Sequence, residues 1–421
     1  MSSSVFDTLP NGMSKTIKPW KVNIAQQRLD DLRALLCLTP LAPPTYENSH
    51  PLPSGEQDAL YFGVRRDWLS AAKQRWEDGG FDWRQHEAYI NSFPHFQAQV
   101  HDETLDNTFD IHFVGLFSPR KDAVPVVFLH GWPGSFLEFL PILEKLRSRY
   151  NNSCPEDLPY HLIVPSLPGY AFSSAPPTDR NFTTDDAARI FDRLLSSPDH
   201  LGFDAYVVQG GDVGARVGRM MAVQYPHCAA IHLNTSPMPA PEGDLSTPIN
   251  TLEQEGIHRG RRFVQSGSAY AMEHATRPAT IGLVLNASPL ALLAWMGEKF
   301  LEWTDDDPPL DTILESVSLY WLTSTPATSL WSYRQFFGAD AESHASPRWH
   351  IGRNKPFGFS WFRFELSPVP EAWVKCTADT LLFYRQHERG GHFAALELPE
   401  LLWTDVEEFL QLDAVKARFR R

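Results

Sequence analysis

The pattern of apolar and polar residues changes at about residue 95. Before that point, a Pro-rich extended stretch at residues 39–53 lies between helical stretches at residues 22–37 and 64–76. We interpret this part of the chain as an extension that packs on another part of the protein.

From residue 96 onward, short β-rich runs are separated by helical ones. The first two runs, residues 96–101 and 109–117, alternate polar and apolar residues as an antiparallel ribbon does. The later runs are almost continuously apolar, which predicts strands buried on both faces of a parallel sheet: residues 124–131, 161–169, 205–211 and 229–234. Helices are expected between them, at residues 136–150, 184–196 and 215–225, so the order is that of β-α-β units.

After Asn234 this alternation stops, and a helical, aromatic-rich segment continues to about residue 350. Strand-like runs resume at residues 356–364 and 379–384, and a last helix is expected at residues 400–410. A helical insertion in a parallel α/β sheet is typical of a core with a lid. We predict an extension packing on core and lid at residues 1–95, the first part of an α/β core at 96–235, a helical lid at 236–350 and the second part of the core at 351–421.

Composition excludes several classes of protein. Of 421 residues, 43% are hydrophobic, and 51 acidic against 37 basic residues give a formal net charge of -14. This sign opposes phosphate binding, so we expect no nucleic-acid partner. The four cysteines form neither a CxxC pair nor a dense framework, which argues against a zinc ribbon or a disulfide scaffold and favours a reducing compartment.

Membrane segments are not expected either. The amino-terminal residues do not combine a charged region with an apolar one, so they do not resemble a signal peptide. The most apolar long stretch, residues 281–297, is interrupted by Asn286, Ser288 and Pro289 and is shorter than the roughly 20 residues that a bilayer core requires. We interpret it as a buried pair of helices.

The first chemical motif is the sequence GGDVG at residues 210–214, which begins within the end of the apolar run at residues 205–211 and leads into a helix. Small residues two before and two after a central residue are typical of a nucleophile elbow, a strained turn from strand to helix that excludes larger side chains. Here the central residue is Asp212. An ordinary turn in which Asp212 caps the helix has the same pattern.

The second motif, HGWPG, follows the run at residues 124–131 and also precedes a helix. In hydrolases with a nucleophile elbow, the loop at this place supplies one backbone N–H of the oxyanion hole, and the residue after the nucleophile supplies the other. These would be the N–H groups of Trp132 and Val213. Gly and Pro turns are common between strands and helices, so the motif alone does not indicate an oxyanion hole. The candidate elbow later in the chain favours that interpretation.

A histidine and an acid complete the candidate site. His392 follows two glycines near the end of the chain, in the order expected for a general base that comes after its nucleophile. A carboxylate must then orient the imidazole. We place Glu365 first, because it ends a core strand; Asp379, a plausible turn residue, and Glu388, in a charged run expected to be a solvated loop, are the alternatives.

An aspartate nucleophile favours particular substrates. Attack by a carboxylate on carbon makes an ester, which suits an electrophilic sp³ carbon such as that of an epoxide or an alkyl halide. A halide leaving group needs stabilising donors beside the nucleophile, and the Val213 side chain offers none. An epoxide needs a proton donor, and phenols from the lid would serve.

The chain resembles epoxide hydrolases of the microsomal type, especially the soluble fungal members with an α/β-hydrolase fold. The resemblance covers nearly the whole chain, and its motifs are GVRRDWLSAAKQRWEDGGFDWRQHEAYINSFPHF, HGWPGS, QGGDVGA, SGSAYAMEHATRP, KPFGFSWFRFE and RGGHFAALELPE. It implies Asp212 as nucleophile, His392 as base, Glu365 as the acid partner, and Tyr270 and Tyr333 as the pair that opens the ring.

The resemblance implies hydrolysis of an epoxide to a vicinal diol through an ester on Asp212, with no metal and no organic cofactor. It also suggests a soluble, cytoplasmic enzyme without a membrane anchor, and a homodimer. Two alternatives remain at this point: a haloalkane dehalogenase with the same three residues, and a ligand carrier on an inactive hydrolase scaffold.

Overall fold

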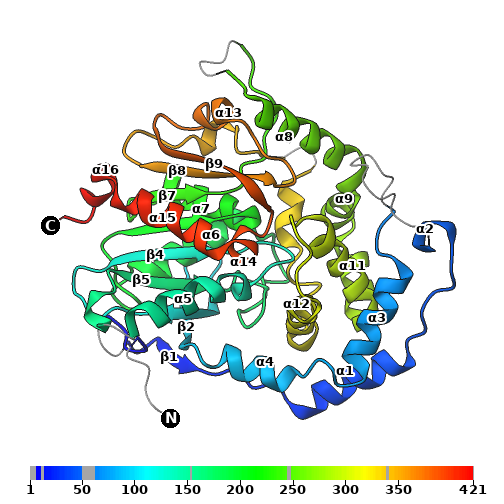
Figure 1. Ribbon diagram of the computed structural model, residues 1–421. Coiled ribbons are helices and arrows are strands. Elements are labelled where there is room, and N and C mark those ends of the chain that lie inside the picture. The colour runs from blue at the N-terminus through cyan, green and yellow to red at the C-terminus, as the bar shows by residue number, and fades with distance from the viewer. Residues whose placement is uncertain are drawn as a thin grey trace.

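A computed structural model of the protein describes residues 6–10, 14–49, 62–151, 154–243, 248–337 and 341–420. Within these ranges one sheet of nine strands forms the centre of the molecule, in the order β1-β2-β3-β5-β4-β6-β7-β8-β9 (Figure 1). The strands are β1 (Ile17–Trp20), β2 (His95–Asp102), β3 (Asn107–Leu116), β4 (Val124–Leu129), β5 (Tyr160–Pro165), β6 (Tyr206–Gly210), β7 (Cys228–Leu233), β8 (Phe357–Phe364) and β9 (Leu381–Gly391).

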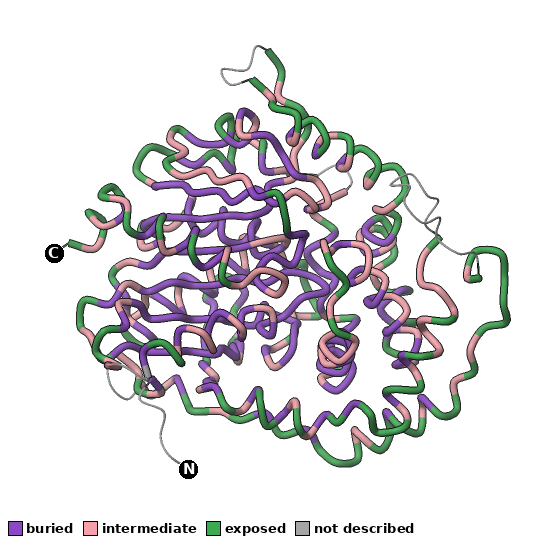
Figure 2. The backbone as a smooth tube through the Cα atoms, viewed as in Figure 1, coloured by how far each residue is buried: buried purple, intermediate pink, exposed green. Residues whose placement is uncertain are grey.

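The two predicted alternating strands, β2 and β3, pair antiparallel along their length, from His95 opposite Val114 to Asp102 opposite Asn107. From β5 through β4 and β6 to β9, neighbouring strands pair in parallel. All residues of β5, β6 and β7 are buried, because helices cover both faces of a parallel sheet. Figure 2 shows this buried centre surrounded by more exposed helices. The predicted α/β class with a mostly parallel sheet is confirmed.

Helices cover the sheet on both faces. One face carries α5 (Leu140–Asn151), α14 (Ala394–Glu397) and α15 (Pro399–Gln411), and the other carries α6 (Thr184–Ser196) and α7 (Asp212–Gln224). The start of α6 is fixed by a capping box, in which Asp186 accepts a hydrogen bond from the Thr183 backbone N–H at 2.9 Å and Thr183 Oγ1 accepts one from the Asp186 N–H. The helix then buries Ile190, Phe191 and Leu194 against the sheet.

A helical segment inserted between β7 and β8 lies beside the carboxyl ends of the central strands (Figure 1). Its longer helices are α8 (Thr251–Arg262), α9 (Ala269–Thr276), α10 (Pro278–Ala287), α11 (Pro289–Glu302) and α12 (Leu310–Thr323). In the described part of the chain, no single helix is long and apolar enough to span a membrane. Helices α10 and α11 together have the required length and apolarity, but a bend of 115° separates them. The pair of helices expected at residues 281–297 is therefore present, but only α11 is mostly buried, because α10 exposes Leu283 and Val284.

The amino-terminal segment contains α1 (Gln26–Leu38), α2 (Tyr46–Ser49), α3 (Arg66–Glu77) and α4 (Trp83–Ile90), and it runs along the outside of the inserted helices (Figure 1). Helices α1 and α3 contact α11 and α12. Arg75 forms a bidentate ion pair with Asp311 in α12, at 3.0 and 2.7 Å, and Arg28 donates to the Trp321 carbonyl oxygen at 2.8 Å. Because β1 joins the sheet edge, the segment touches both the sheet and the inserted helices.

Three expectations about local structure were wrong. The chain forms β1 at Ile17–Trp20, where no strand was predicted, and α2 occupies part of the stretch expected to be extended; the end of that stretch, residues 50–53, lies outside the described residues. The last strand continues to Gly391, so the charged run at residues 385–389 is a strand and not a loop. Buried Asp405 explains this, because it pairs with Arg385 at 3.0 Å and with His387 at 2.6 Å.

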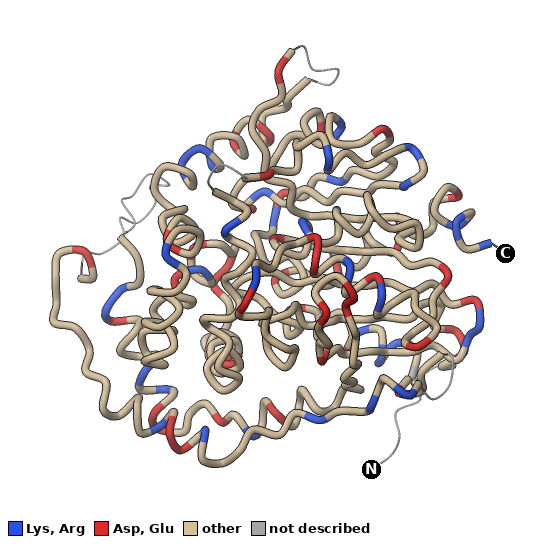
Figure 3. Tube along the Cα trace, turned by 180° about the vertical axis from the view of Figure 1, so that it is seen from behind, with Lys and Arg blue, Asp and Glu red and all other residues tan. Residues whose placement is uncertain are grey.

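The surface charge is mixed. Figure 3 shows Lys and Arg positions interspersed with Asp and Glu positions along the described trace. A nucleic-acid-binding domain instead gathers basic residues on one face or along one helix.

Candidate active site

Asp212 opens α7 directly after β6, in a backbone conformation that few side chains adopt. Its φ is +48°, a region that costs a non-glycine residue about 1–3 kcal/mol. The turn is crowded, because a Cβ on Gly214 would lie 2.1 Å from the Leu129 carbonyl oxygen. Asp212 is the first helical residue, and Gly211 holds the cap position. The turn thus has the geometry of a nucleophile elbow and not that of an Asp-capped helix.

The HGWPG loop after β4 brings a backbone donor to this aspartate. The Trp132 N–H donates to Asp212 Oδ1 at 2.8 Å, and a Cβ on Gly131 would lie 2.2 Å from the same oxygen. Only glycine therefore fits at position 131. Val213 lies in the first turn of α7, where backbone N–H groups have no acceptor within the helix. Of the two N–H groups predicted for an oxyanion hole, that of Trp132 thus contacts the Asp212 carboxylate, and that of Val213 lies at the amino-terminal end of α7.

His392 follows β9 and lies between two carboxylates. Its Nδ1 is 2.7 Å from Glu365 Oε1, and its Nε2 is 3.7 Å from Asp212 Oδ2. Glu365, just after β8, also accepts hydrogen bonds from Thr235 Oγ1 at 2.6 Å and from the Leu366 N–H at 2.6 Å. These contacts leave Nε2 as the ring nitrogen that faces Asp212.

The two carboxylates control the charge of the imidazole. Burial lowers the pKa of His392, but the charges of Glu365, Asp212 and Glu138 and the hydrogen bond to Glu365 together outweigh burial and raise it to about 9. Burial raises the pKa of Glu365, yet the charge and hydrogen bond of His392 and the other two donors bring it below its usual value. The pair is therefore a carboxylate and an imidazolium at neutral pH in the unmodified enzyme.

Tyr270 in α9 and Tyr333 in the 3₁₀ turn η4 (Trp331–Gln335) reach the site from the inserted helices. Both are buried, their ring centroids are 5.9 Å apart, and each ring lies against the Trp132 indole, at 5.4 and 5.8 Å. The Tyr270 and Tyr333 side chains also interact through their hydroxyls. Burial and the nearby charge of Asp212 hold the pKa of both phenols well above 10, so both keep their protons at neutral pH.

The competing acids do not reach His392. Asp379 accepts hydrogen bonds from His350 Nε2 at 2.9 Å and from the Arg353 N–H at 3.0 Å, at an exposed position. Glu388 is an exposed residue of β9. Of the three acids considered from the sequence, Glu365 alone contacts the imidazole.

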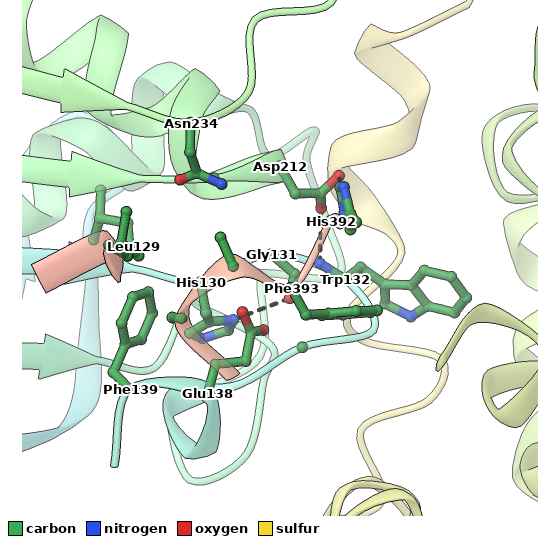
Figure 4. A pocket seen from close by; sticks show the side chains of 15 residues that line it. Leu129, His130, Gly131, Trp132, Glu138, Phe139, Asp212, Asn234, His392 and Phe393 are labelled. Atoms are coloured by element: carbon green, nitrogen blue, oxygen red, sulfur yellow. Dashed lines mark hydrogen bonds and ion pairs between the residues drawn. The ribbon is translucent and has the colours of Figure 1, made fainter. Parts of the chain in front are cut away.

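Sequence reasoning missed two polar residues at the site. Glu138, in the 3₁₀ turn η1 (Phe136–Phe139), and Asn234, just after β7, line a small cavity together with Asp212 and His392 (Figure 4). Burial raises the pKa of Glu138 to about 8. A single acid within the otherwise apolar run FLEFLPIL was the available signal for Glu138. Asn234 carries no sequence signal, because only the fold brings it there.

In the described part of the chain, no group of three or more His, Cys, Asp or Glu side chains is arranged to hold a metal ion. The donors gathered around Asp212 are instead a backbone N–H, an imidazole and two phenols. They can support nucleophilic attack by a carboxylate and proton transfer at two separate places.

Comparison with known proteins places this site in a family. The family model "Epoxide hydrolase N terminus" matches residues 17–139, and that of the α/β hydrolase fold matches residues 124–252. A provisionally named epoxide hydrolase of Dothistroma septosporum is 42% identical over 97% of this chain and 93% of its own length. Epoxide hydrolase 1 of Sus scrofa is 31% identical over 94% of this chain and 89% of its own length.

Solved structures agree. The epoxide hydrolase of Aspergillus niger is 46% identical, covers 96% of this chain and 99% of its own, and superposes with a TM-score of 0.86. Juvenile hormone epoxide hydrolase of the silkworm Bombyx mori is 25% identical with a TM-score of 0.78, and 96% of each chain is covered. The chain is therefore an enzyme of the epoxide hydrolase family, with the α/β-hydrolase fold and the amino-terminal segment of that family.

Proposed function

We propose that the enzyme converts an epoxide and water into a vicinal diol through a covalent ester on Asp212. The observation that carries the proposal is the placement of Asp212. Its carboxylate meets the Trp132 N–H at 2.8 Å and His392 Nε2 at 3.7 Å, while the charge of Asp212 acts on the buried phenols of Tyr270 and Tyr333. A nucleophile, a base and two acids thus surround one point.

In the first step, Asp212 attacks one ring carbon and the carbon–oxygen bond on that carbon breaks. The ring oxygen takes a proton from Tyr270 or Tyr333, which can donate because the pKa of both phenols lies well above neutrality. The product of this step is a hydroxyalkyl ester. We further propose that residues 236–350 act as the lid that carries these phenols, with residues 1–95 as a support on its outer side.

In the second step, His392 Nε2 removes a proton from water, and the water oxygen adds to the Asp212 carbonyl carbon. The Trp132 and Val213 N–H groups stabilise the resulting oxyanion. Collapse breaks the acyl carbon–oxygen bond, and the diol oxygen takes the proton back from His392. The new Asp212 carboxyl loses its remaining proton, which restores the phenol of Tyr270 or Tyr333, so every group returns to its starting charge. Ester formation removes the Asp212 charge that helps to raise the pKa of His392. A larger fraction of the imidazole is therefore neutral, and able to accept a proton from water, once the ester exists.

A single turnover in ¹⁸O-labelled water tests the covalent route. One oxygen of Asp212 leaves with the diol, so the first diol formed should be unlabelled and ¹⁸O should appear in the peptide that contains Asp212. Styrene oxide is a suitable substrate, added at less than one molecule per molecule of enzyme so that each active site reacts at most once. Label in the first diol would mean direct attack by water and would contradict the proposal.

Removing both phenols should slow the first step specifically. The double variant Tyr270→Phe/Tyr333→Phe lacks the proton donors for the ring oxygen, so we expect ester formation to fall by about 10²–10⁴-fold, the usual contribution of a general acid. Hydrolysis of the ester, once formed, should change little. Rapid-quench detection of the ester separates the two rates.

Tyr160→Phe is the matched control, because this buried tyrosine on β5 contacts Gln411 in α15 and not the site. It should retain the wild-type rate of ester formation. Equal rates in the control and the double variant would refute the role of the phenols.

A further inference from the structure

The hydrolytic step needs a place for its water, and the structure holds a cavity at Asp212. Its wall includes Asp212, His392, Glu138, Asn234 and Gly131, and neither Tyr270 nor Tyr333 is among its lining residues (Figure 4). The space is small enough for about one water molecule. It therefore differs from the place between the carboxylate and the phenols where the epoxide would bind.

Glu138 faces the reacting groups across this cavity, since Figure 4 shows Asp212 and His392 on one side and Glu138 on the other. The carboxyl lies over the backbone of the HGWPG loop, because a Cβ on Gly134 would lie only 1.3 Å from Glu138 Oε1. In the described part of the chain it forms no ion pair with a lysine or arginine. Its carboxyl accepts a hydrogen bond from the Ser135 backbone N–H. A carboxyl offers further hydrogen-bonding positions beyond this one, and burial favours their use.

Electrostatics link the three groups. Burial raises the pKa of Glu138 to about 8, with the charge of His392 lowering it and that of Asp212 raising it. In turn the charge of Glu138 contributes to the raised pKa of His392. Burial thus favours the neutral form of the Glu138 carboxyl, which can both donate and accept hydrogen bonds.

We propose that Glu138 positions the hydrolytic water against the Asp212 ester and His392. The water would enter the cavity on the core side, donate one hydrogen bond to His392 Nε2 and make a second to the Glu138 carboxyl, with its oxygen directed at the Asp212 carbonyl carbon. Glu138 is thus a positioning residue for the second step and has no part in the first. The inference rests on the ester mechanism proposed above.

Glu138→Gln tests this division, because it keeps the size of the side chain and removes the acid. In single turnovers followed by rapid quench, we expect ester formation from styrene oxide within about 2-fold of wild type, and ester hydrolysis slower by about 10–100-fold. In the steady state kcat and KM should fall together while kcat/KM stays constant, since hydrolysis follows the step that fixes kcat/KM. A merely structural defect would lower kcat/KM.

A second variant acts through the backbone. Gly134→Ala places a methyl group where the Glu138 carboxyl lies, so it should displace that carboxyl and give the same selective loss, which keeps the test decisive if Glu138→Gln does not fold. Glu144→Gln is the matched control. Glu144 lies in α5, pairs with Arg147 and is not among the residues that line the cavity. Its two rates should equal those of wild type.

The outcomes are distinguishable. Normal ester hydrolysis in Glu138→Gln, or equal slowing of both steps, would overturn the role of Glu138 and leave the ester mechanism standing. Failure to trap an ester in wild type and in every variant would overturn the proposed function and this inference with it. Partial recovery of ester hydrolysis in Glu138→Asp would support the role of the carboxyl.

Discussion

Replacing His392 with glutamine should stop the enzyme after its first chemical step and trap the substrate on Asp212. The base that activates water is removed, while the nucleophile and the phenols stay in place. We expect turnover to fall by about 10²–10⁴-fold, as for loss of a general base. The intact protein should gain the mass of one epoxide molecule, and peptide mapping should place that mass on Asp212.

His350→Gln is the control for this experiment. His350 is a partly exposed histidine that pairs with Asp379, away from Asp212, and its loss should leave turnover unchanged with no adduct. If His392→Gln gave neither an adduct nor a slower ester hydrolysis, the imidazole would not be the base of the second step.

The same histidine sets the pH dependence of the second step. Hydrolysis of the ester requires neutral His392, so its rate should rise with pH and level off above the pKa of the imidazole. That pKa is about 9 in the unmodified enzyme, partly because of the Asp212 charge, and it should be lower in the ester, where this charge is absent. Single-turnover hydrolysis measured from pH 5 upward checks this, and a rate that fell as pH rose would contradict it.

Asp212→Asn should abolish diol formation, with a loss of about 10⁶-fold, the scale found when a covalent nucleophile is removed. An amide is nearly isosteric with the carboxylate, and its oxygen can still accept the Trp132 hydrogen bond that Asp212 Oδ1 accepts at 2.8 Å. The fold should therefore persist. Diol release by gas chromatography and ester formation by mass spectrometry should both be at background.

Asp379→Asn is the matched variant for this prediction. It makes the same chemical change at an acid that the sequence also offered for the site, but the structure places Asp379 on the surface with His350 and Arg353. Full activity is expected. Activity lost equally in both variants would indicate a general defect in folding and would remove the support for Asp212 as nucleophile.

Much of the fold follows from local patterns. The continuous apolar runs that became β4 to β7 are buried on both faces of the sheet. The alternating run that became β2 leaves one face more exposed, whereas β3 buries its last six residues on both faces. Expectation failed where local pattern and tertiary contact disagree. The charged residues 385–389 continue β9, because Asp405, a buried residue of α15, pairs with Arg385 and His387 of this strand.

The sequence by itself determined the α/β class and contained the motifs that predict Asp212, His392 and Glu365 as site residues, because elbow turns and core strands leave short-range signals. Only the tertiary structure decided which acid contacts His392 and brought Glu138 and Asn234 to Asp212. The reason is physical. Burial and the charges of partners far away in sequence determine the pKa of these groups, and the chain order carries no information about such distances.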